Sequence, residues 1–380
     1  MKILYVIPTM GCGGAEILLG AIARSLAKKG HEVHILCLQP HHDSWSNYPD
    51  KEDLEREVRL RVIGGSVQFQ FLRKPVIDNY AFKAYVEEVN PDIIHSHLFL
   101  SELLSRSVSY KGIKYFSHGH DNMPQLKKLS IRTFTSKARL ANFWERNWLL
   151  SQYRRVNNRF IAISLDVKAY LETNVSEFSD RITYLPNGID TLRFRCERNY
   201  EAPSGRFHMV SIANLVPKKN HVFLIDVIRV LVDNGFDVTM DVLGFGPLMD
   251  TLLERTKAAG LEERLIFRGS VGEIPKRLKE AHLYVHPAWY EPFGLVILEA
   301  MASGLPVVSL DGFGNRELMK EGENGFMLPT DSSAKDFAEK ISYFITHPAE
   351  RERMGKFALG FSESYDIHKY TDKLLDIYRS

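Results

Sequence analysis

The chain has 380 residues, of which 44% are hydrophobic and 25% are charged, the composition of a soluble globular protein with room for two domains. Its net charge of only +2 argues against a nucleic-acid-binding protein and against a protein drawn to membranes by its overall charge. Cys12, Cys37 and Cys196 lack C-x-x-C spacing and no stretch approaches the roughly 20 apolar residues of a membrane span, so we expect a cytoplasmic protein without a disulfide framework.

Strand and helix patterns alternate along almost the whole chain, starting with a strand at 3–8 that leads into a glycine turn and does not resemble a signal peptide. This alternation predicts an α/β fold with doubly wound parallel sheets. Further strands are predicted at 32–38, 60–63, 93–95, 115–117 and 160–164, and then at 209–213, 238–243, 265–268, 283–286 and 307–310. Helices are predicted at 15–29, 81–89, 221–233, from 247, and at 366–379.

The segment 185–205 separates the two halves of this pattern. It is rich in turn residues and shows little periodicity, which predicts a hinge near residue 195. We therefore expect one domain at 1–194 and a second at 195–363.

The segment 291–306, EPFGLVILEAMASGLP, carries the strongest functional signal. Glu291 precedes a predicted helix and Glu299 lies inside it, with a Phe293-Gly294-Leu295 turn between them. A helix N-terminus has free N–H donors and a partial positive charge, which suit a phosphate. Carboxylates accept hydrogen bonds from sugar hydroxyls, so the combination predicts a nucleotide-sugar site.

The same segment resembles the signature of the retaining glycosyltransferases of the GT-B fold, in particular their family 4, E-x-F-G-x-x-x-x-E-A-M-A-x-G-x-P-V. The resemblance implies two Rossmann-like domains that face each other across a cleft. The first, 1–194, would face the acceptor, the second, 195–363, would bind the nucleotide sugar, and a last helix at 364–380 would cross back to the first. The matching residues are Glu291, Phe293, Gly294, Glu299, Ala300, Met301, Ala302, Gly304, Pro306 and Val307.

A glycine-rich turn follows the first predicted strand, GCGGAE at 11–16. It lacks the third glycine of a dinucleotide-binding fingerprint, since Glu16 occupies that place, and the acidic residue expected after the second strand is also missing. A hydride-transfer enzyme is therefore disfavoured. The resemblance implies that the backbone of Gly13 and Gly14 approaches the donor's β-phosphate; a tight turn without a ligand is the alternative.

The first strand of the second domain is followed by Asn214, Lys218 and Lys219. In the family an Arg and a Lys clamp the diphosphate here, so the resemblance assigns donor binding to Lys219 and to Asn214, which stands in the place of the Arg. A neutral amide is not a conservative replacement for a guanidinium, and Lys218 is either a substitute cation or a solvated loop residue. The remaining donor-binding positions implied by the resemblance are Gly244, Val271, Phe293, Gly294, Leu295, Val296 and Glu299.

The resemblance implies two catalytic positions, His118 and Glu291. His118 would meet the donor sugar, although His120 is close enough to confuse the assignment, and Glu291 would bind the sugar 3- and 4-hydroxyls. His95 and His97 form an H-x-H that also fits a metal site, but no carboxylate or cysteine partner is evident.

No D-x-D motif is present, so we expect no metal cofactor. The resemblance implies retention at the anomeric carbon, with Glu299 on the ribose hydroxyls. The leaving-group charge would be stabilised by Lys219, the Gly13-Gly14 turn and the helix N-terminus after Phe293, as preorganised donors do in other enzymes.

The stretch 123–159 mixes basic and aromatic residues. Such helices either dock peripherally on an anionic membrane surface or pack their aromatic residues inward. We expect a glycan or polyprenyl-diphosphate-linked acceptor, a donor that is a UDP-sugar, and a role in cell-surface polysaccharide synthesis, with no nucleic acid partner. The alternatives are a nucleotide-sugar epimerase of the same fold and a non-catalytic partner subunit, the latter suggested by Asn214.

Overall fold

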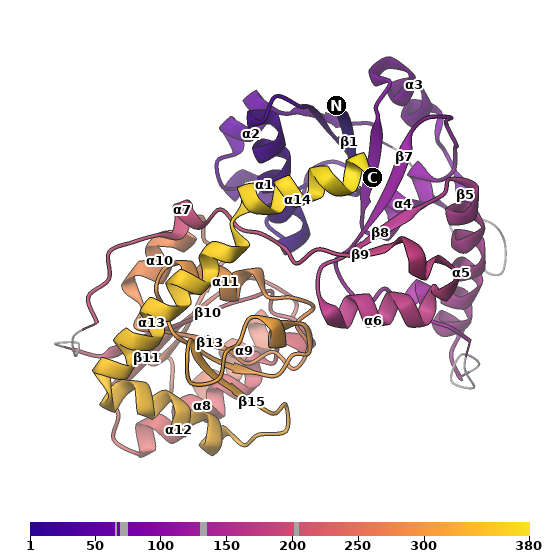
Figure 1. The fold of residues 1–380 in the computed structure, drawn as a ribbon. Helices are drawn as coiled ribbons and strands as arrows, with labels where there is room; N and C mark the ends of the chain where they lie inside the picture. Colours follow the sequence, from indigo (N-terminus) through magenta and orange to yellow (C-terminus); the bar gives the residue numbers. More distant parts are fainter. Residues whose placement is uncertain (65–66, 69–74, 130–134, 201–204) are drawn as a thin grey trace. The chain divides into compact units, whose positions relative to one another are not determined.

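The computed structural model describes residues 1–64, 67–68, 75–129, 135–200 and 205–380. It divides into two compact units, one formed by Met1–Asn187 with Tyr370–Ser380 and the other by Gly188–Lys369. Each unit has a parallel sheet covered by helices (Figure 1). The division at Gly188 falls before the hinge expected near residue 195, and positions 201–204 of that hinge segment lie outside the described residues.

The first unit contains a seven-stranded sheet in the order β3-β2-β1-β6-β7-β8-β9. All neighbouring strands in it are parallel, and β4 and β5 form a separate antiparallel pair. The strand order reverses between β1 and β6, and ligands of such sheets bind at the carboxyl ends of the strands where this happens. The strands are β1 Lys2–Ile7, β2 Glu32–Cys37, β3 Arg59–Val62, β4 Val67–Gln68, β5 Val76–Ile77, β6 Ile93–His97, β7 Lys114–Gly119, β8 Arg159–Ala162 and β9 Ile182–Tyr184.

Alternating side chains of β1 fix the two faces of this sheet. Leu4 and Val6 join a buried cluster with Phe82 of α3, whereas Tyr5 points the other way and hydrogen-bonds to Tyr378 Oη of α14 at 3.0 Å. Helices therefore cover both faces, which is the doubly wound arrangement. The helices of this unit are α1 Gly14–Lys28, α2 Lys51–Glu57, α3 Tyr80–Val89, α4 Phe99–Ser105, α5 Lys137–Arg155 and α6 Leu165–Asn174.

The second unit contains a six-stranded parallel sheet in the order β12-β11-β10-β13-β14-β15. Its strand order reverses between β10 and β13. The strands are β10 Phe207–Ile212, β11 Val238–Leu243, β12 Leu265–Gly269, β13 Leu283–His286, β14 Val307–Leu310 and β15 Gly325–Leu328. The helices are α7 Thr191–Phe194, α8 His221–Asp233, α9 Met249–Ala258, α10 Ile274–Glu280, α11 Leu295–Ala302, α12 Ala334–Thr346 and α13 Pro348–Ser362.

The core of the second unit lies between this sheet and α8 with α12. Leu224 and Ile228 of α8 and Phe337 of α12 are fully buried in one cluster with the strand residues. The start of α12 is fixed by a capping box, in which Ser333 and Asp336 satisfy each other's backbone N–H groups.

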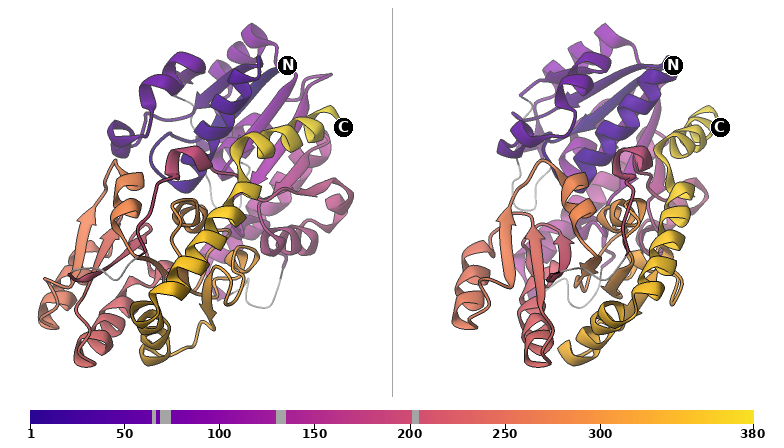
Figure 2. Two further views of the ribbon diagram at one scale, coloured as in Figure 1. Left: turned by 60° about the vertical axis from the view of Figure 1, so that its left-hand side comes forward. Right: turned by 90° about the vertical axis from the view of Figure 1, so that its left-hand side faces the viewer.

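The last helix is α14, Ile367–Arg379, which follows α13 after a short 3-10 turn, Glu363–Tyr365 (Figure 2). Its start belongs to the second unit, where Ile367 N–H donates to Ile189 O at 2.8 Å. From Tyr370 onward it belongs to the first unit, and Thr371 and Ser25 of α1 share a buried hydrogen bond of 2.8 Å. No helix among the described residues combines the length and the apolar character that a membrane crossing requires.

Candidate functional site

The segment predicted as strand, loop, helix and strand has that structure, from β13 through α11 to β14. Glu291 lies in the loop after β13, and Glu299 lies in the second turn of α11. Gly294 stands at the N-cap of α11 with a φ of +104°, a conformation that side chains disfavour, and a Cβ there would lie 2.9 Å from Ile297 Cδ1. The glycine of the signature is therefore required by the turn that starts the helix.

Glu291 is the centre of a buried ion pair. Its Oε2 lies 2.5 Å from Lys219 Nζ and accepts a hydrogen bond of 3.0 Å from His286 Nε2. Burial alone would raise the pKa of Glu291, but the Lys219 ammonium outweighs it, followed by His286, and the pKa lies well below its ordinary value. Glu291 is thus an ionised carboxylate held between two donors.

His286 was not predicted from the sequence. It is the last residue of β13, and its Nδ1 lies 3.3 Å from Tyr284 Oη, which also lies 3.3 Å from Ile212 O. Burial lowers the pKa of His286 against the opposing effect of Glu291, so the ring is neutral near pH 7 and donates through Nε2. His286 therefore positions the Glu291 carboxylate; its place five residues before Glu291, at a strand end, was the available signal.

Glu299 has the opposite electrostatic character. It is 8% exposed on α11, and burial raises its pKa to about 7, with Arg193 opposing the shift. The two carboxylates of the signature are therefore not equivalent, since one is ionised at all ordinary pH values and the other titrates near neutrality.

The loops after β10, β11 and β12 lie side by side at the carboxyl ends of these strands. Lys219 ends a short 3-10 turn, Pro217–Lys219, and Asn214 is exposed on the same loop. Gly244 N–H donates to Gly269 O at 2.8 Å, and Val271 follows in the loop before α10. Asn214, Lys219, Gly244 and Val271 thus share the sheet edge with Glu291.

Gly244 has a φ of +143°, and a Cβ there would overlap the Ala213 carbonyl oxygen. We expect Gly244→Ala to lower the free energy of unfolding by more than about 1 kcal/mol, because neither the backbone conformation nor the space tolerates the methyl group. Urea unfolding checks this, with Gly272→Ala as the control, since nothing lies within 4 Å of a Cβ at Gly272. Equal stability of the two variants would contradict the expectation.

In the first unit, Gly13 is the N-cap of α1 and Gly14 its first residue. A Cβ at Gly13 would overlap the Glu16 carboxylate, so the glycine leaves room for that side chain to fold back over the helix start. Burial raises the pKa of Glu16, while its own backbone N–H and His42 oppose the shift. The resemblance implied a β-phosphate contact at this turn, with a tight turn without a ligand as the alternative, and the place of Glu16 over the helix start was not predicted.

His118, on β7, belongs to a stack of histidines, of which His95, His97 and His118 are buried. His97 and His118 stack with ring centroids 4.7 Å apart and an angle of 19°, as do His118 and His120 at 4.5 Å. His118 Nδ1 lies 3.2 Å from His95 Nε2, and His95 Nδ1 lies 2.5 Å from Tyr378 Oη. Burial lowers the pKa of His118 to about 4, opposed by Asn187, so this ring is neutral at pH 7.

The same histidines bear on the alternative of a metal site. Among the described residues, His95, His97 and His118 each place a ring nitrogen within 4.8 Å of the others. Imidazole binds a metal through a lone pair in the ring plane. The His118 ring is inclined by only 21° to His95 and 19° to His97, so its lone pairs run beside those of its neighbours rather than to a common point. The geometry therefore favours a hydrogen-bonded stack, and the absence of a metal cofactor stays a prediction.

A cavity of about 340 Å³ lies beside this stack in the first unit. Its wall is largely apolar apart from the two histidines and Asp121. Leu98 borders it with φ +68° and ψ 157°, a conformation that is otherwise almost confined to glycine. The lining residues are Pro8, Leu98, Phe99, Leu100, His118, His120, Asp121, Met123 and Pro124.

The basic stretch 123–159 consists of α5 and the segment that precedes it. Two of its residues, Arg132 and Phe134, lie outside the described residues. Arg154 makes two hydrogen bonds to Glu177, at 2.7 and 2.8 Å, and Arg146 donates to Leu126 O and Asn174 O. Tyr153 is fully buried, whereas Trp144 is 41% exposed. Arg146 and Tyr153 are therefore engaged inside the first unit, whereas the Arg154–Glu177 pair lies at its surface.

The two doubly wound parallel-sheet units define the GT-B class of fold. The structure is similar to HepE from Anabaena in complex with UDP-glucose, with a TM-score of 0.78 and 21% identity over 99% of this chain and 98% of that one. It is also similar to sucrose-phosphate synthase from Thermosynechococcus elongatus, with a TM-score of 0.76 and 18% identity over 100% and 98% of the chains.

The models of two families match the chain, "Glycosyl transferases group 1" over residues 195–360 and "Glycosyltransferase Family 4" over residues 12–193. The chain therefore belongs to the group 1 glycosyltransferases of family 4, as the signature segment predicts, and it is an enzyme of that class. It is 25% identical to D-inositol 3-phosphate glycosyltransferase from Arthrobacter sp. over 97% of this chain and 90% of the relative. It is 23% identical to UDP-Gal:alpha-D-GlcNAc-diphosphoundecaprenol alpha-1,3-galactosyltransferase from Escherichia coli over 76% and 75% of the two chains.

Proposed function

We propose that the protein transfers a sugar from a UDP-sugar, with retention at the anomeric carbon and without a metal ion, to a glycan or a lipid-linked acceptor in cell-surface polysaccharide synthesis. The observation that carries the donor part is the buried Lys219–Glu291–His286 cluster at the edge where the strand order of the second sheet reverses. One similar structure is described as a complex with UDP-glucose, and one relative is named for a UDP-galactose donor and a diphosphoundecaprenol acceptor.

The proposed roles follow from the chemistry of each group. Lys219 donates to the diphosphate and stabilises the charge that develops on it as the sugar leaves. Glu291, ionised and fixed by His286, accepts hydrogen bonds from the sugar hydroxyls, and Glu299 accepts from the ribose. Backbone N–H groups at 293–296, the start of α11, donate to phosphate oxygens.

The first unit would contribute His118 and would bind the acceptor. A neutral imidazole donates one hydrogen bond without adding charge, which suits a contact with a sugar hydroxyl. The apolar wall of the 340 Å³ cavity beside it suits the hydrocarbon part of an acceptor more than a free oligosaccharide. Peripheral contact of α5 with a cytoplasmic membrane face, through Trp144, belongs to the same proposal.

The donor proposal is tested by thermal unfolding with UDP, GDP, ADP and their glucose conjugates, each with and without EDTA. A ligand at a hundred times its dissociation constant adds about 2.7 kcal/mol of stability. We expect UDP and a UDP-sugar to raise the melting temperature equally in both conditions, because Lys219 and the backbone donors act in place of a cation.

Two results would count against this proposal. A shift that disappears with EDTA would reject the metal-independent mechanism. No shift with any nucleotide would mean that Asn214 does not replace the missing guanidinium, and a non-catalytic partner subunit would then be the better description.

A further inference from the structure

The loop after β14 holds a bulky residue in a strained conformation. Phe313 has φ +72° and ψ −69°, a region that side chains with a Cβ rarely occupy. Among the described residues, the other non-glycine residues with positive φ are Leu98 and four Asp or Asn residues, which tolerate it better. Phe313 and Leu98 are thus the two bulky exceptions, and both follow the carboxyl end of a parallel strand beside a proposed site.

The strain is held in place by the backbone around Glu291. Glu291 N–H donates to Gly312 O at 2.8 Å, and Gly314 N–H donates to Glu291 O at 3.0 Å. A Cβ at Gly312 would lie 2.8 Å from Glu291 N, and one at Gly314 would overlap Pro292 O. The buried Asn315 side chain accepts from Gly312 N at 2.8 Å. The loop therefore wraps tightly around Glu291, which fixes the backbone at Phe313 and the direction of its Cα–Cβ bond.

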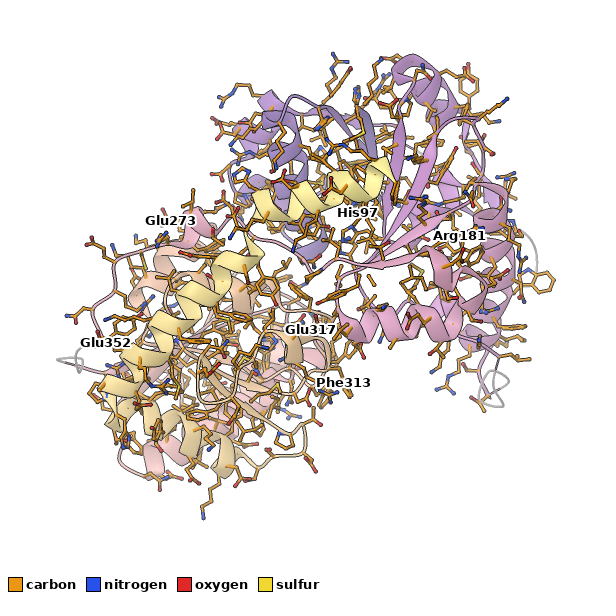
Figure 3. All side chains as sticks on the ribbon, in the orientation of Figure 1. His97, Arg181, Glu273, Phe313, Glu317 and Glu352 are labelled. Carbon is orange, nitrogen blue, oxygen red and sulfur yellow. The ribbon has the colours of Figure 1, made fainter. Side chains whose placement is uncertain are left out.

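The Phe313 side chain contributes little to the core. It is 44% exposed, and its ring lies 6.4 Å from that of Tyr290. The Arg316 guanidinium lies 5.0 Å from the ring centroid and is itself fixed by Asp311, at 2.7 and 2.8 Å. Phe313 and Glu317 of this loop are labelled in Figure 3. A strained backbone that presents a half-exposed ring is not explained by stability, and strain of this kind concentrates at ligand sites.

We propose that the Phe313 ring packs against the pyranose ring of the donor sugar whose hydroxyls Glu291 binds. A pyranose has an apolar face of C–H groups and a rim of hydroxyls, so an aromatic ring next to a carboxylate matches both parts. This inference rests on the proposed function, because Glu291 is there assigned to the donor sugar. It adds a contact that recognises the sugar and not the nucleotide.

The test measures the dissociation constants of UDP and of the best-binding UDP-sugar among UDP-glucose, UDP-galactose and UDP-N-acetylglucosamine by titration calorimetry. We expect Phe313→Gly to weaken the UDP-sugar about 3- to 10-fold, the range of a lost aromatic contact, and to leave UDP unchanged. Phe313→Tyr should retain the affinity of the unaltered chain. The melting temperature of Phe313→Gly should not fall, because glycine relieves the backbone strain.

The control is Phe357→Ala, which removes a ring of similar exposure, 39%, from α13; both affinities should stay as they are. Equal weakening of UDP and the UDP-sugar in Phe313→Gly would assign the ring to the nucleobase or to loop integrity and overturn the inference. Unchanged binding of both ligands would also overturn it. If the unaltered chain binds none of these ligands, the proposed function itself fails, which is a separate result.

Discussion

Replacing Lys219 by Met is expected to lower the free energy of unfolding by about 3–5 kcal/mol near pH 7, the range measured when one partner of a buried ion pair is removed. The Lys219 ammonium lies 2.5 Å from Glu291 Oε2, and the two side chains are only 15% and 9% exposed. Without Lys219, the Glu291 carboxylate stays buried with His286 as its remaining donor in the cluster. His286 limits the loss, because it can take up a proton and supply the missing charge.

The pH dependence of this loss has a defined sign. The pKa of Glu291 is depressed in the folded chain, so this group contributes stability that is present above its ordinary pKa of 4.5 and is lost as the pH falls toward the folded value. Lys219→Met removes the largest cause of this depression and leaves His286, so the difference from the unaltered chain should be largest above pH 5 and should shrink on acidification. Urea unfolding between pH 3 and pH 8 measures it.

A double-mutant cycle separates the ion pair from the packing of the lysine stem. Glu291→Gln together with Lys219→Met removes both charges, and this double variant should recover most of the lost stability, since no buried charge remains unpaired. Lys218→Met, one residue earlier, is the matched control for removal of a lysine from the same loop. Additive losses in the double variant would show that the pair does not couple.

The fold was predictable because strand and helix patterns follow the chain locally. The strands predicted at 238–243, 283–286 and 307–310 coincide with β11, β13 and β14, since each is a short apolar run between turn residues. The position at which α14 passes from the second unit to the first was harder to predict from the sequence. It depends on contacts between residues far apart in the chain, such as Tyr378 with Tyr5, 373 positions apart.

The residues of the candidate site likewise divide into those that lie in one segment of the sequence and those that are far apart in it. Glu291, Glu299 and Gly294 could be placed from the sequence because one segment carries them. The ion pair of Lys219 with Glu291 spans 72 positions and could not be predicted. The role of His286 was recognised only from the structure, in which the end of β13 directs its side chain toward Glu291. Phe313 could not be predicted, because glycines on both sides indicate a flexible turn and not a rigid loop held against Glu291.

The last prediction concerns Glu299→Gln, which should stabilise the protein in alkaline but not in acidic solution. Burial raises the pKa of Glu299 from 4.5 to about 7, so the folded chain binds more protons than the unfolded chain between these values. Stability therefore falls as the pH rises through this window, by about 3 kcal/mol in total at roughly 1.4 kcal/mol per pKa unit. A neutral amide does not ionise, so the variant should escape this fall.

Urea unfolding at pH 5, 6, 7 and 8 should give a stability difference that grows from about 1 kcal/mol at pH 5 to about 3 kcal/mol at pH 8, in favour of Glu299→Gln. Glu254→Gln, at an exposed position of α9, changes the net charge equally and should show no such growth. UDP binding should weaken in Glu299→Gln while stability rises, because an amide is a poorer acceptor for ribose hydroxyls than a carboxylate. Effects of opposite sign on stability and on UDP affinity distinguish a functional carboxylate from a structural one. Replacing a structural carboxylate would lower the stability and the affinity together. A Glu299→Gln variant that is less stable than the unaltered chain at pH 8 would reject the view that burial, only partly offset by Arg193, sets the pKa of Glu299.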